Sequence, residues 1–209
     1  MMNVLTTDEV ENFTHRCLWR VVTRQLEHAE AQRSGALYDD LAAMVFAFHA
    51  FEAHLNFLGQ RLAPDIWEDE QNFFRKEPYR GFEGKVRKVF DLCQLPEPDR
   101  CTKPYSMIWA LKDLRDLIAH GKTEVFTETY VHGVNEPPRF PRGRFDDLVS
   151  HAKALEAKQD IHAVAPILHT AARRLSCDDQ LYLRDVWFGD DPLDGPLGHA
   201  TGTMTPANP

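Results

Sequence analysis

Apolar residues recur every three or four positions along most of this chain, a spacing that predicts amphipathic helices. The most apolar segment runs from about residue 37 to 61, and its apolar positions alternate in steps of four and three: Leu41, Met44 or Val45, Phe48, Phe51, Leu55 and Leu58. A helix that is apolar around most of its circumference lies in the middle of a bundle. The sequence therefore predicts an all-α helical bundle with this segment as its central helix.

Start and stop signals place the other helices. Four core helices are expected, over about residues 7–35, 37–61, 85–94 and 104–120. The first is expected to begin at Thr7, because Thr6 or Thr7 can cap it and acidic residues follow. Further helical patterns cover about 145–157, 160–175 (with Pro166 kinking or splitting it) and a last turn near 181–187. One short strand or extended arm is expected over 123–131, where β-branched and aromatic residues gather.

The predicted helix that stops at Gly121 carries the residues best suited to chemistry. It contains Arg-Asp-Leu-Ile-Ala-His, in which four residues separate Arg115 from His120. Gly121 stands where a helix end favours a residue that can take positive φ. Arg115 offers a planar, permanently charged fork that suits a phosphate, and His120 can exchange protons near neutrality. The pair therefore suits phosphodiester cleavage through a ribose 2′-hydroxyl without a metal.

Helix geometry leaves other interpretations open. Positions five apart lie about 140° apart around an ideal helix. Arg115 and His120 would therefore converge only if the helix unwinds at Gly121, or if a second subunit completes the site. In a purely structural role, His120 would cap the helix by bonding a late carbonyl group, and Arg115 would pair with Asp116 or Glu83.

The motif and the helix before it resemble the HEPN superfamily, all-α domains many of which are ribonucleases. The resemblance rests on Arg-x4-His with a polar residue after the arginine, and on the upstream Phe51-Glu52-Ala53-His54-Leu55-Asn56. That stretch looks like the long apolar helix with acidic or amide side chains found in the family. The resemblance covers roughly residues 10–122. The domains are therefore predicted as a HEPN-like helical core over 7–122, a C-terminal extension packed on it over 123–188, and a flexible tail over 189–209.

This resemblance implies a metal-independent endoribonuclease of toxin, defence or stress type that leaves a 2′,3′-cyclic phosphate and needs no cofactor. The site residues it implies are Arg115 and His120 as the catalytic pair, with Asp116, Glu52 and Asn56 as supporting groups. Lys112 and Lys122, which cluster with Arg115 in the motif helix, are weaker candidates for substrate binding. HEPN ribonucleases are similar in forming homodimers whose motif helices face each other across the two-fold. An antitoxin or nucleotidyltransferase-type partner is a further expectation. Other HEPN proteins imply an alternative, a non-catalytic module that binds a partner protein or nucleotide.

Composition narrows these expectations. The net charge is −8, which argues against broad, non-specific nucleic-acid binding because such binding depends on phosphate neutralisation by Lys and Arg. It leaves room for a local basic cleft, and Lys85, Arg87 and Lys88 cluster in one segment.

The four cysteines are scattered, no signal-peptide pattern opens the chain, and no apolar run reaches the roughly 20 residues that span a bilayer. A reduced cytoplasmic location without a membrane partner is expected.

A metal centre is not expected. His49, Glu52 and His54 invite comparison with di-iron bundles, which use Glu-x-x-His from two helices. Here the order is reversed, the second such motif is missing from the sequence, and the two histidines lie about 140° apart on an ideal helix. Both histidines are expected to be buried polar groups satisfied by neighbouring helices.

Overall fold

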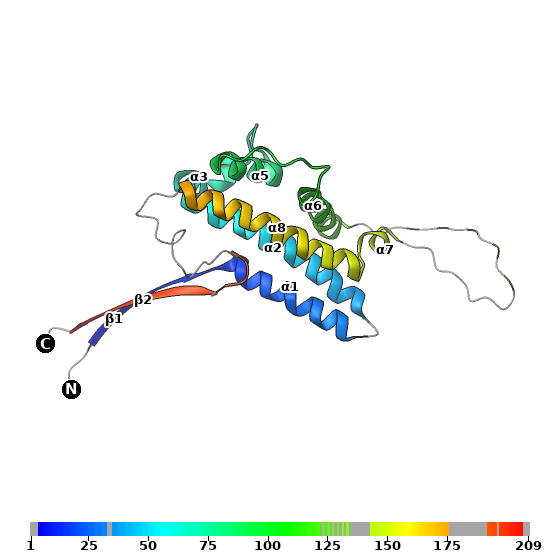
Figure 1. The fold of residues 1–209 in the computed structure, drawn as a ribbon, viewed down its shortest axis with the longest axis horizontal. Coiled ribbons are helices and arrows are strands. Elements are labelled where there is room, and N and C mark those ends of the chain that lie inside the picture. The colour runs from blue at the N-terminus through cyan, green and yellow to red at the C-terminus, as the bar shows by residue number, and fades with distance from the viewer. Residues whose placement is uncertain are drawn as a thin grey trace. The chain divides into compact units, whose positions relative to one another are not determined.

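The computed structural model describes residues 4–32 and 35–121, the odd-numbered residues from 123 to 133, and residues 143–175, 192–195 and 197–206. Its helices are α1 (Thr14–Ala31), α2 (Ala36–Leu62), α3 (Pro64–Glu68), α4 (Glu70–Phe73), α5 (Gly81–Leu92), α6 (Tyr105–Ala119), α7 (Arg144–Leu148) and α8 (His151–Leu175). Two strands, β1 (Val4–Asn12) and β2 (Gly198–Pro206), complete the described elements (Figure 1). The predicted all-α helical bundle is confirmed.

The chain divides into two compact units. The first unit comprises Met1–Arg20, His49–Pro98 and Val164–Pro209, and the second comprises Val21–Phe48 and Asp99–Ala163. The division falls within α1, α2 and α8, so each of these helices contributes residues to both units. The candidate residues of the sequence are therefore shared between two structural environments, which are described separately below.

Helix α2 has the buried apolar stripe that the sequence predicts. Phe48, Phe51, Leu55 and Leu58 are all at most 1% exposed. The segment is also long and apolar enough to cross a membrane by length and composition alone, with a mean hydropathy of 1.3. More than half of that window is buried inside the fold, as in the core helix of a bundle.

The two ends of the chain differ from the prediction. The first helix was expected from Thr7, but β1 occupies that stretch and α1 begins only at Thr14. The flexible tail predicted over 189–209 contains β2, which pairs antiparallel with β1 in a register that runs from Val4↔Pro206 to Asn12↔Gly198. Thr and Val are favoured in paired strands. Pairing with a segment far away in the sequence outweighs the local signals for a helix cap.

The C-terminal helices also differ from the prediction. Helix α8 is continuous through Pro166, whereas the sequence suggested two pieces over 145–157 and 160–175. The described residues of 123–131 belong to neither helix nor strand. The last turn expected near 181–187 lies outside the described residues.

Candidate functional site

The motif helix α6 forms close to its predicted bounds because one face is apolar and Pro104 precedes its first turn. Its buried side chains are Met107, Ile108, Leu111 and Leu114. The motif residues Lys112, Arg115 and Asp116 are only partly exposed, and His120 is exposed. One face of α6 thus anchors the helix in the second unit and leaves the polar motif accessible.

The helix end differs from the expected glycine cap. His120 is itself the C-cap, with φ −116° and ψ 14°, and its backbone N–H donates to the Asp116 carbonyl at 2.9 Å. Gly121 does not have a positive φ. A Cβ atom at Gly121 would instead lie 2.9 Å from the Leu117 carbonyl oxygen. Glycine is favoured here by close backbone approach rather than by left-handed geometry.

Asp116 holds two basic side chains of the motif. Its Oδ1 accepts a hydrogen bond from Arg115 Nη1 at 2.7 Å, and its Oδ2 accepts one from Lys112 Nζ at 2.9 Å. The bond from Lys112, with the nearby charge of Arg115, lowers the pKa of the Asp116 carboxyl. Lys112 Nζ also lies 3.6 Å from Asp113. Asp116 is therefore an ionised group that orients Arg115, the role that the HEPN resemblance implies for it.

Arg115 is fixed from a second side by an aromatic ring. Its Cζ lies 5.0 Å from the centroid of Phe48, within cation–π range. Its side chain is 31% exposed, and its buried Nε has no hydrogen-bond partner in the described part of the chain. The guanidinium therefore has a set orientation and a partly open surface, and its Nη groups carry more N–H donors than the one bond to Asp116 uses.

His120 has a different environment from Arg115. Its ring is exposed, and the described residues give it no hydrogen-bond partner. Only its backbone caps the helix, so its imidazole remains accessible to solvent or to a ligand. An accessible imidazole can exchange protons with a bound molecule, as a general acid or base must.

The other predicted site residues are in the first unit or outside the description. Glu52 lies 3.7 Å from Lys85 Nζ and 3.8 Å from His49 Nδ1. Asn56 Oδ1 accepts a hydrogen bond from Trp67 Nε1 at 3.3 Å. Lys122 lies outside the described residues. Glu52 and Asn56 thus have partners of their own within the first unit.

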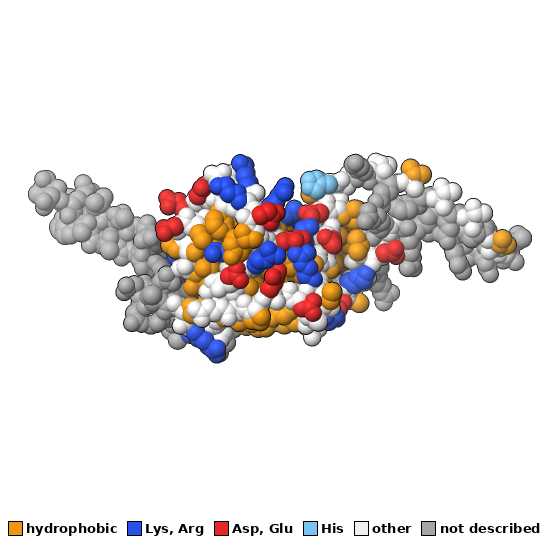
Figure 2. All heavy atoms as spheres, turned by 90° about the horizontal axis from the view of Figure 1, so that it is seen from above, with side chains coloured by type: hydrophobic (Ala, Val, Ile, Leu, Met, Phe, Trp, Pro, Cys, Tyr) orange, Lys and Arg blue, Asp and Glu red, His pale blue; other side chains and the backbone are white. Residues whose placement is uncertain are grey.

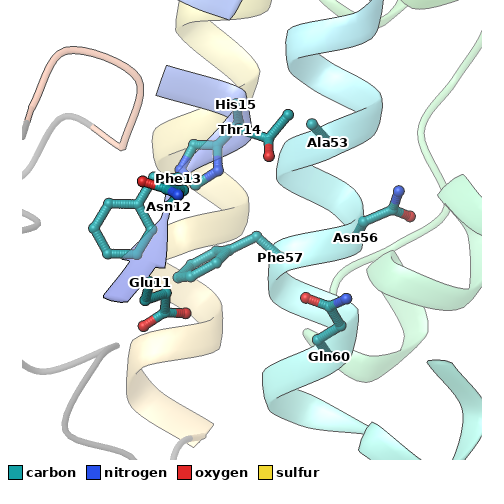
Figure 3. A pocket seen from close by; sticks show the side chains of 9 residues that line it. All are labelled: Glu11, Asn12, Phe13, Thr14, His15, Ala53, Asn56, Phe57 and Gln60. Atoms are coloured by element: carbon teal, nitrogen blue, oxygen red, sulfur yellow. The ribbon is translucent and has the colours of Figure 1, made fainter. Parts of the chain in front are cut away.

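Asn56 also lines a pocket of about 230 Å³ in the first unit. The lining comes from the end of β1, the start of α1 and one side of α2: Glu11, Asn12, Phe13, Thr14, His15, Ala53, Asn56, Phe57 and Gln60. Figure 3 shows Asn56 and Gln60 on the α2 side and Phe57 nearer the middle. The Phe13 and Phe57 rings meet edge to face with centroids 5.9 Å apart. Sequence reasoning missed this pocket because three separate segments form it.

Three buried histidines pack ring against ring in the first unit. His15 lies 5.3 Å from His54, and His54 lies 6.0 Å from His169, between ring centroids. Burial, with the Arg16 charge next in importance, lowers the pKa of His15 to about 3. Burial, followed by the neighbouring His15, also lowers the pKa of His54 well below its ordinary value. The imidazoles of His15 and His54 are therefore neutral near pH 7.

The histidine predictions are corrected in two respects. His54 is buried as expected, but neither ring nitrogen has a hydrogen-bond partner among the residues described, so it is held by stacking. His49 is not buried, since its side chain is 43% exposed. Within the described ranges no group of three His, Cys, Asp or Glu residues has the geometry to hold a metal ion. The cluster was not visible in the sequence because its members come from three distant helices.

Charge on the surface is mixed. Figure 2 shows acidic and basic side chains interspersed on one face of the molecule, in line with the net charge of −8. Comparison with protein-family models, curated proteins and solved structures gave no match for this chain. The case for a function therefore rests on the residues and contacts described above.

Proposed function

We propose that this protein is a metal-independent endoribonuclease that uses Arg115 and His120. One observation carries the proposal: an accessible imidazole ends α6, and five residues earlier a guanidinium is oriented by Asp116 and Phe48. The first group can move protons, and the second can stabilise negative charge on a phosphate. The resemblance of the Arg-x4-His segment to HEPN ribonucleases supports the same reaction.

In the proposed reaction, the ribose 2′-hydroxyl attacks the adjacent phosphorus atom and the bond to the 5′-oxygen breaks. His120 takes the 2′-hydroxyl proton, and the departing 5′-oxygen receives a proton from a protonated imidazole or from water. Arg115 donates hydrogen bonds to the phosphate oxygens as negative charge grows on them. The products are a 2′,3′-cyclic phosphate and a free 5′-hydroxyl. Asp116 keeps the Arg115 fork from rotating away.

A symmetric homodimer is part of the proposal. Arg115 and His120 lie about 140° apart on an ideal helix, so one copy of α6 presents them in different directions. Two copies of α6 at a two-fold axis would bring Arg115 of one protomer towards His120 of its partner. Mixing Arg115→Ala and His120→Ala proteins tests this arrangement. A shared site restores about a quarter of wild-type activity in a random mixture of dimers, whereas a site within one protomer restores none.

The alternative is a non-catalytic module that binds a partner protein or nucleotide. The observation in its favour is the ion-pair cluster in which Asp116 binds both Lys112 and Arg115. Such pairing reduces the positive charge available to an RNA phosphate. In this alternative, α6 serves as a docking surface, and His120 has no chemical role.

Cleavage of a labelled RNA in EDTA decides between the two. The proteins compared are the wild type, His120→Ala and the control His28→Ala, which removes another exposed histidine (hydrogen-bonded to Asp39 and Gln32). The enzyme proposal expects cutting by the wild type and His28→Ala only, with a 2′,3′-cyclic phosphate on the product. Equal cutting by all three would identify a contaminant or a different site. Absence of cutting in a folded dimer would favour the module.

A further inference from the structure

The segment that runs from the turn after α4 into α5 is basic in an acidic protein. Residues 75–88 contain six Lys or Arg residues against two Glu, although the whole chain has a net charge of −8. The structure separates these cations into two groups, those paired with a carboxylate and those without such a pair among the described residues.

Two of the cations are neutralised by carboxylates. Lys85 Nζ lies 2.5 Å from Glu70 and is almost buried, at 9% side-chain exposure. Arg87 Nε donates to Glu97 at 3.1 Å. The charges of these two side chains are therefore balanced by carboxylates within the first unit.

Three further cations lie in the turn before α5: Arg75, Lys76 and Arg80. All three are exposed, and none forms an ion pair with a carboxylate among the residues that the structure describes. Glu77 is the acidic residue within the turn. Lys88, from α5, adds a fourth cation: its Nζ lies 5.0 Å from the Tyr79 ring centroid and 5.8 Å from that of Phe73. We call Arg75, Lys76, Arg80 and Lys88 the basic turn.

The backbone that carries these cations is fixed on α5. Tyr79 Oη donates to Asp91 at 2.8 Å, and Arg87 Nη1 donates to the Pro78 carbonyl at 2.8 Å. A Cβ atom at Gly84 would lie 1.8 Å from the Tyr79 carbonyl carbon, so only glycine lets the turn sit this close to the helix. A fixed turn loses little conformational entropy when it binds a ligand.

The chemistry of the basic turn suits a chain of phosphates. Two guanidinium groups can each bind a phosphate through two hydrogen bonds, and the two ammonium groups add charge. The half-exposed Tyr79 ring, stacked on Phe73 at 5.7 Å with an interplanar angle of 19°, adds an aromatic surface beside them. Cations next to aromatic rings are the usual elements of single-strand nucleic-acid binding.

We propose that the basic turn binds the phosphates of single-stranded RNA and holds the substrate of this protein. The proposal rests on the proposed ribonuclease function for its choice of RNA. The basic turn belongs to the first unit. It also explains how a protein with a net charge of −8 can bind RNA, because the binding charge is concentrated in one turn.

The test measures RNA binding without cleavage. Fluorescence anisotropy with a labelled single-stranded RNA is done in a His120→Ala background, where the RNA stays intact. Arg75→Gln/Lys76→Gln/Arg80→Gln is compared with a control of equal charge loss, Arg24→Gln/Lys158→Gln/Arg174→Gln. We expect at least tenfold weaker binding for the turn variant and less than twofold for the control. The slope of log K against log salt concentration should become shallower by about 2 for the turn variant.

Further outcomes separate the two proposals. Glu77→Gln removes the acid of the turn and should tighten binding about twofold, with an unchanged melting temperature. Equal affinity of the turn variant and the control, or no RNA binding at all, would overturn the inference. Equal loss of affinity for polyglutamate would show an acidic-protein surface and overturn the choice of RNA. RNA binding through the turn without cleavage by the wild type leaves the inference standing while the ribonuclease proposal fails. Cleavage by the turn variant at an unchanged kcat/KM would overturn the inference and leave the ribonuclease proposal standing.

Discussion

The same residue type has opposite environments in the two units. In the first unit, His15, His54 and His169 are each at most 2% exposed and pack against one another. In the second unit, His120 ends α6 with its ring exposed. Burial disfavours the charged imidazole and keeps His15 and His54 neutral, while the His120 ring is open to solvent. Histidine content therefore says little about chemistry until the burial of each ring is known.

The contrast extends to the neighbouring arginines. Arg16 is completely buried beside the histidine cluster, and its Nε donates to the Pro192 carbonyl at 3.0 Å. Arg115 is half-exposed and held by a carboxylate and an aromatic ring. The first arginine helps to build the fold, whereas the second keeps donor capacity for a ligand. The predictions below test this division between a structural and a chemical histidine–arginine pair.

The largest effects are expected from replacing His120 and His54 with alanine, and the two variants should fail in different ways. His120→Ala should lower RNA cleavage by at least about 100-fold, because a general acid–base group contributes that much or more, and should leave the melting temperature unchanged. His54→Ala should lower the free energy of unfolding by about 2–4 kcal/mol through a core cavity and leave the activity of folded protein intact. Cleavage assays and urea unfolding on both variants measure this. Loss of cleavage in folded His54→Ala would break the comparison.

Arg115→Lys should have the next largest effect. A single ammonium group cannot hold both Asp116 and a phosphate in the way a planar fork does. We expect kcat to fall about 10- to 100-fold, as for the loss of a group that stabilises developing charge, with the free energy of unfolding nearly unchanged. Arg173→Lys, on α8, is the matched control. A kcat that stays at the wild-type value would show that Arg115 contributes only charge.

Acid should destabilise the first unit through its buried histidines. The unfolded imidazole has a pKa of 6.5, whereas that of folded His15 is about 3. The unfolded chain therefore binds more protons between these values, and stability is present above about pH 6.5 and is lost as the pH falls towards 3. Each such histidine contributes about 1 kcal/mol per pH unit. Urea unfolding at pH 7.5 and 5.0 measures how the free energy of unfolding depends on pH. This dependence should be shallower for His54→Leu than for the wild type. Identical slopes would contradict neutral burial of His54.

The smallest effect is expected at the end of α6. Gly121→Ala places a Cβ atom against the Leu117 carbonyl, so the last turn must shift slightly. We expect a loss of about 1 kcal/mol in the free energy of unfolding and a modest fall in kcat, since His120 moves with the turn. Gly35→Ala, where φ is +89°, is a control that strains the backbone far from the motif in the sequence. A kcat unaffected by Gly121→Ala would show that the position of His120 tolerates movement.

Helix positions could be predicted from the sequence, and the ends of the chain could not. The bounds of α2 and α6 follow from apolar spacing and from Pro64 and Pro104, which are local signals. The pairing of β1 with β2 depends on two segments nearly two hundred residues apart, and no local pattern records that. Thr6 and Thr7 therefore match a helix cap by local pattern, although they lie in β1.

The candidate site could be predicted only where its contacts lie within one helix, because local signals do not record contacts between distant segments. The contact of Asp116 with Arg115 joins neighbouring residues, and the sequence could offer it only as one of two pairings, with Glu83 as the other. The Phe48 ring under Arg115 and the partners of Glu52 and Asn56 come from other elements. Their distances depend on packing, which a linear pattern does not encode.

The sequence by itself determined the helical class, the central apolar helix and an arginine and a histidine near the end of one helix, because these depend on interactions within a few residues. Tertiary structure alone decided which histidines are neutral and which is accessible, since burial depends on segments brought together from the whole chain. It also decided which cations pair with carboxylates and which stay exposed without such a pair among the described residues, and the second group defines the basic turn. Local chemistry supplies candidate groups, and long-range packing determines their charge, exposure and partners.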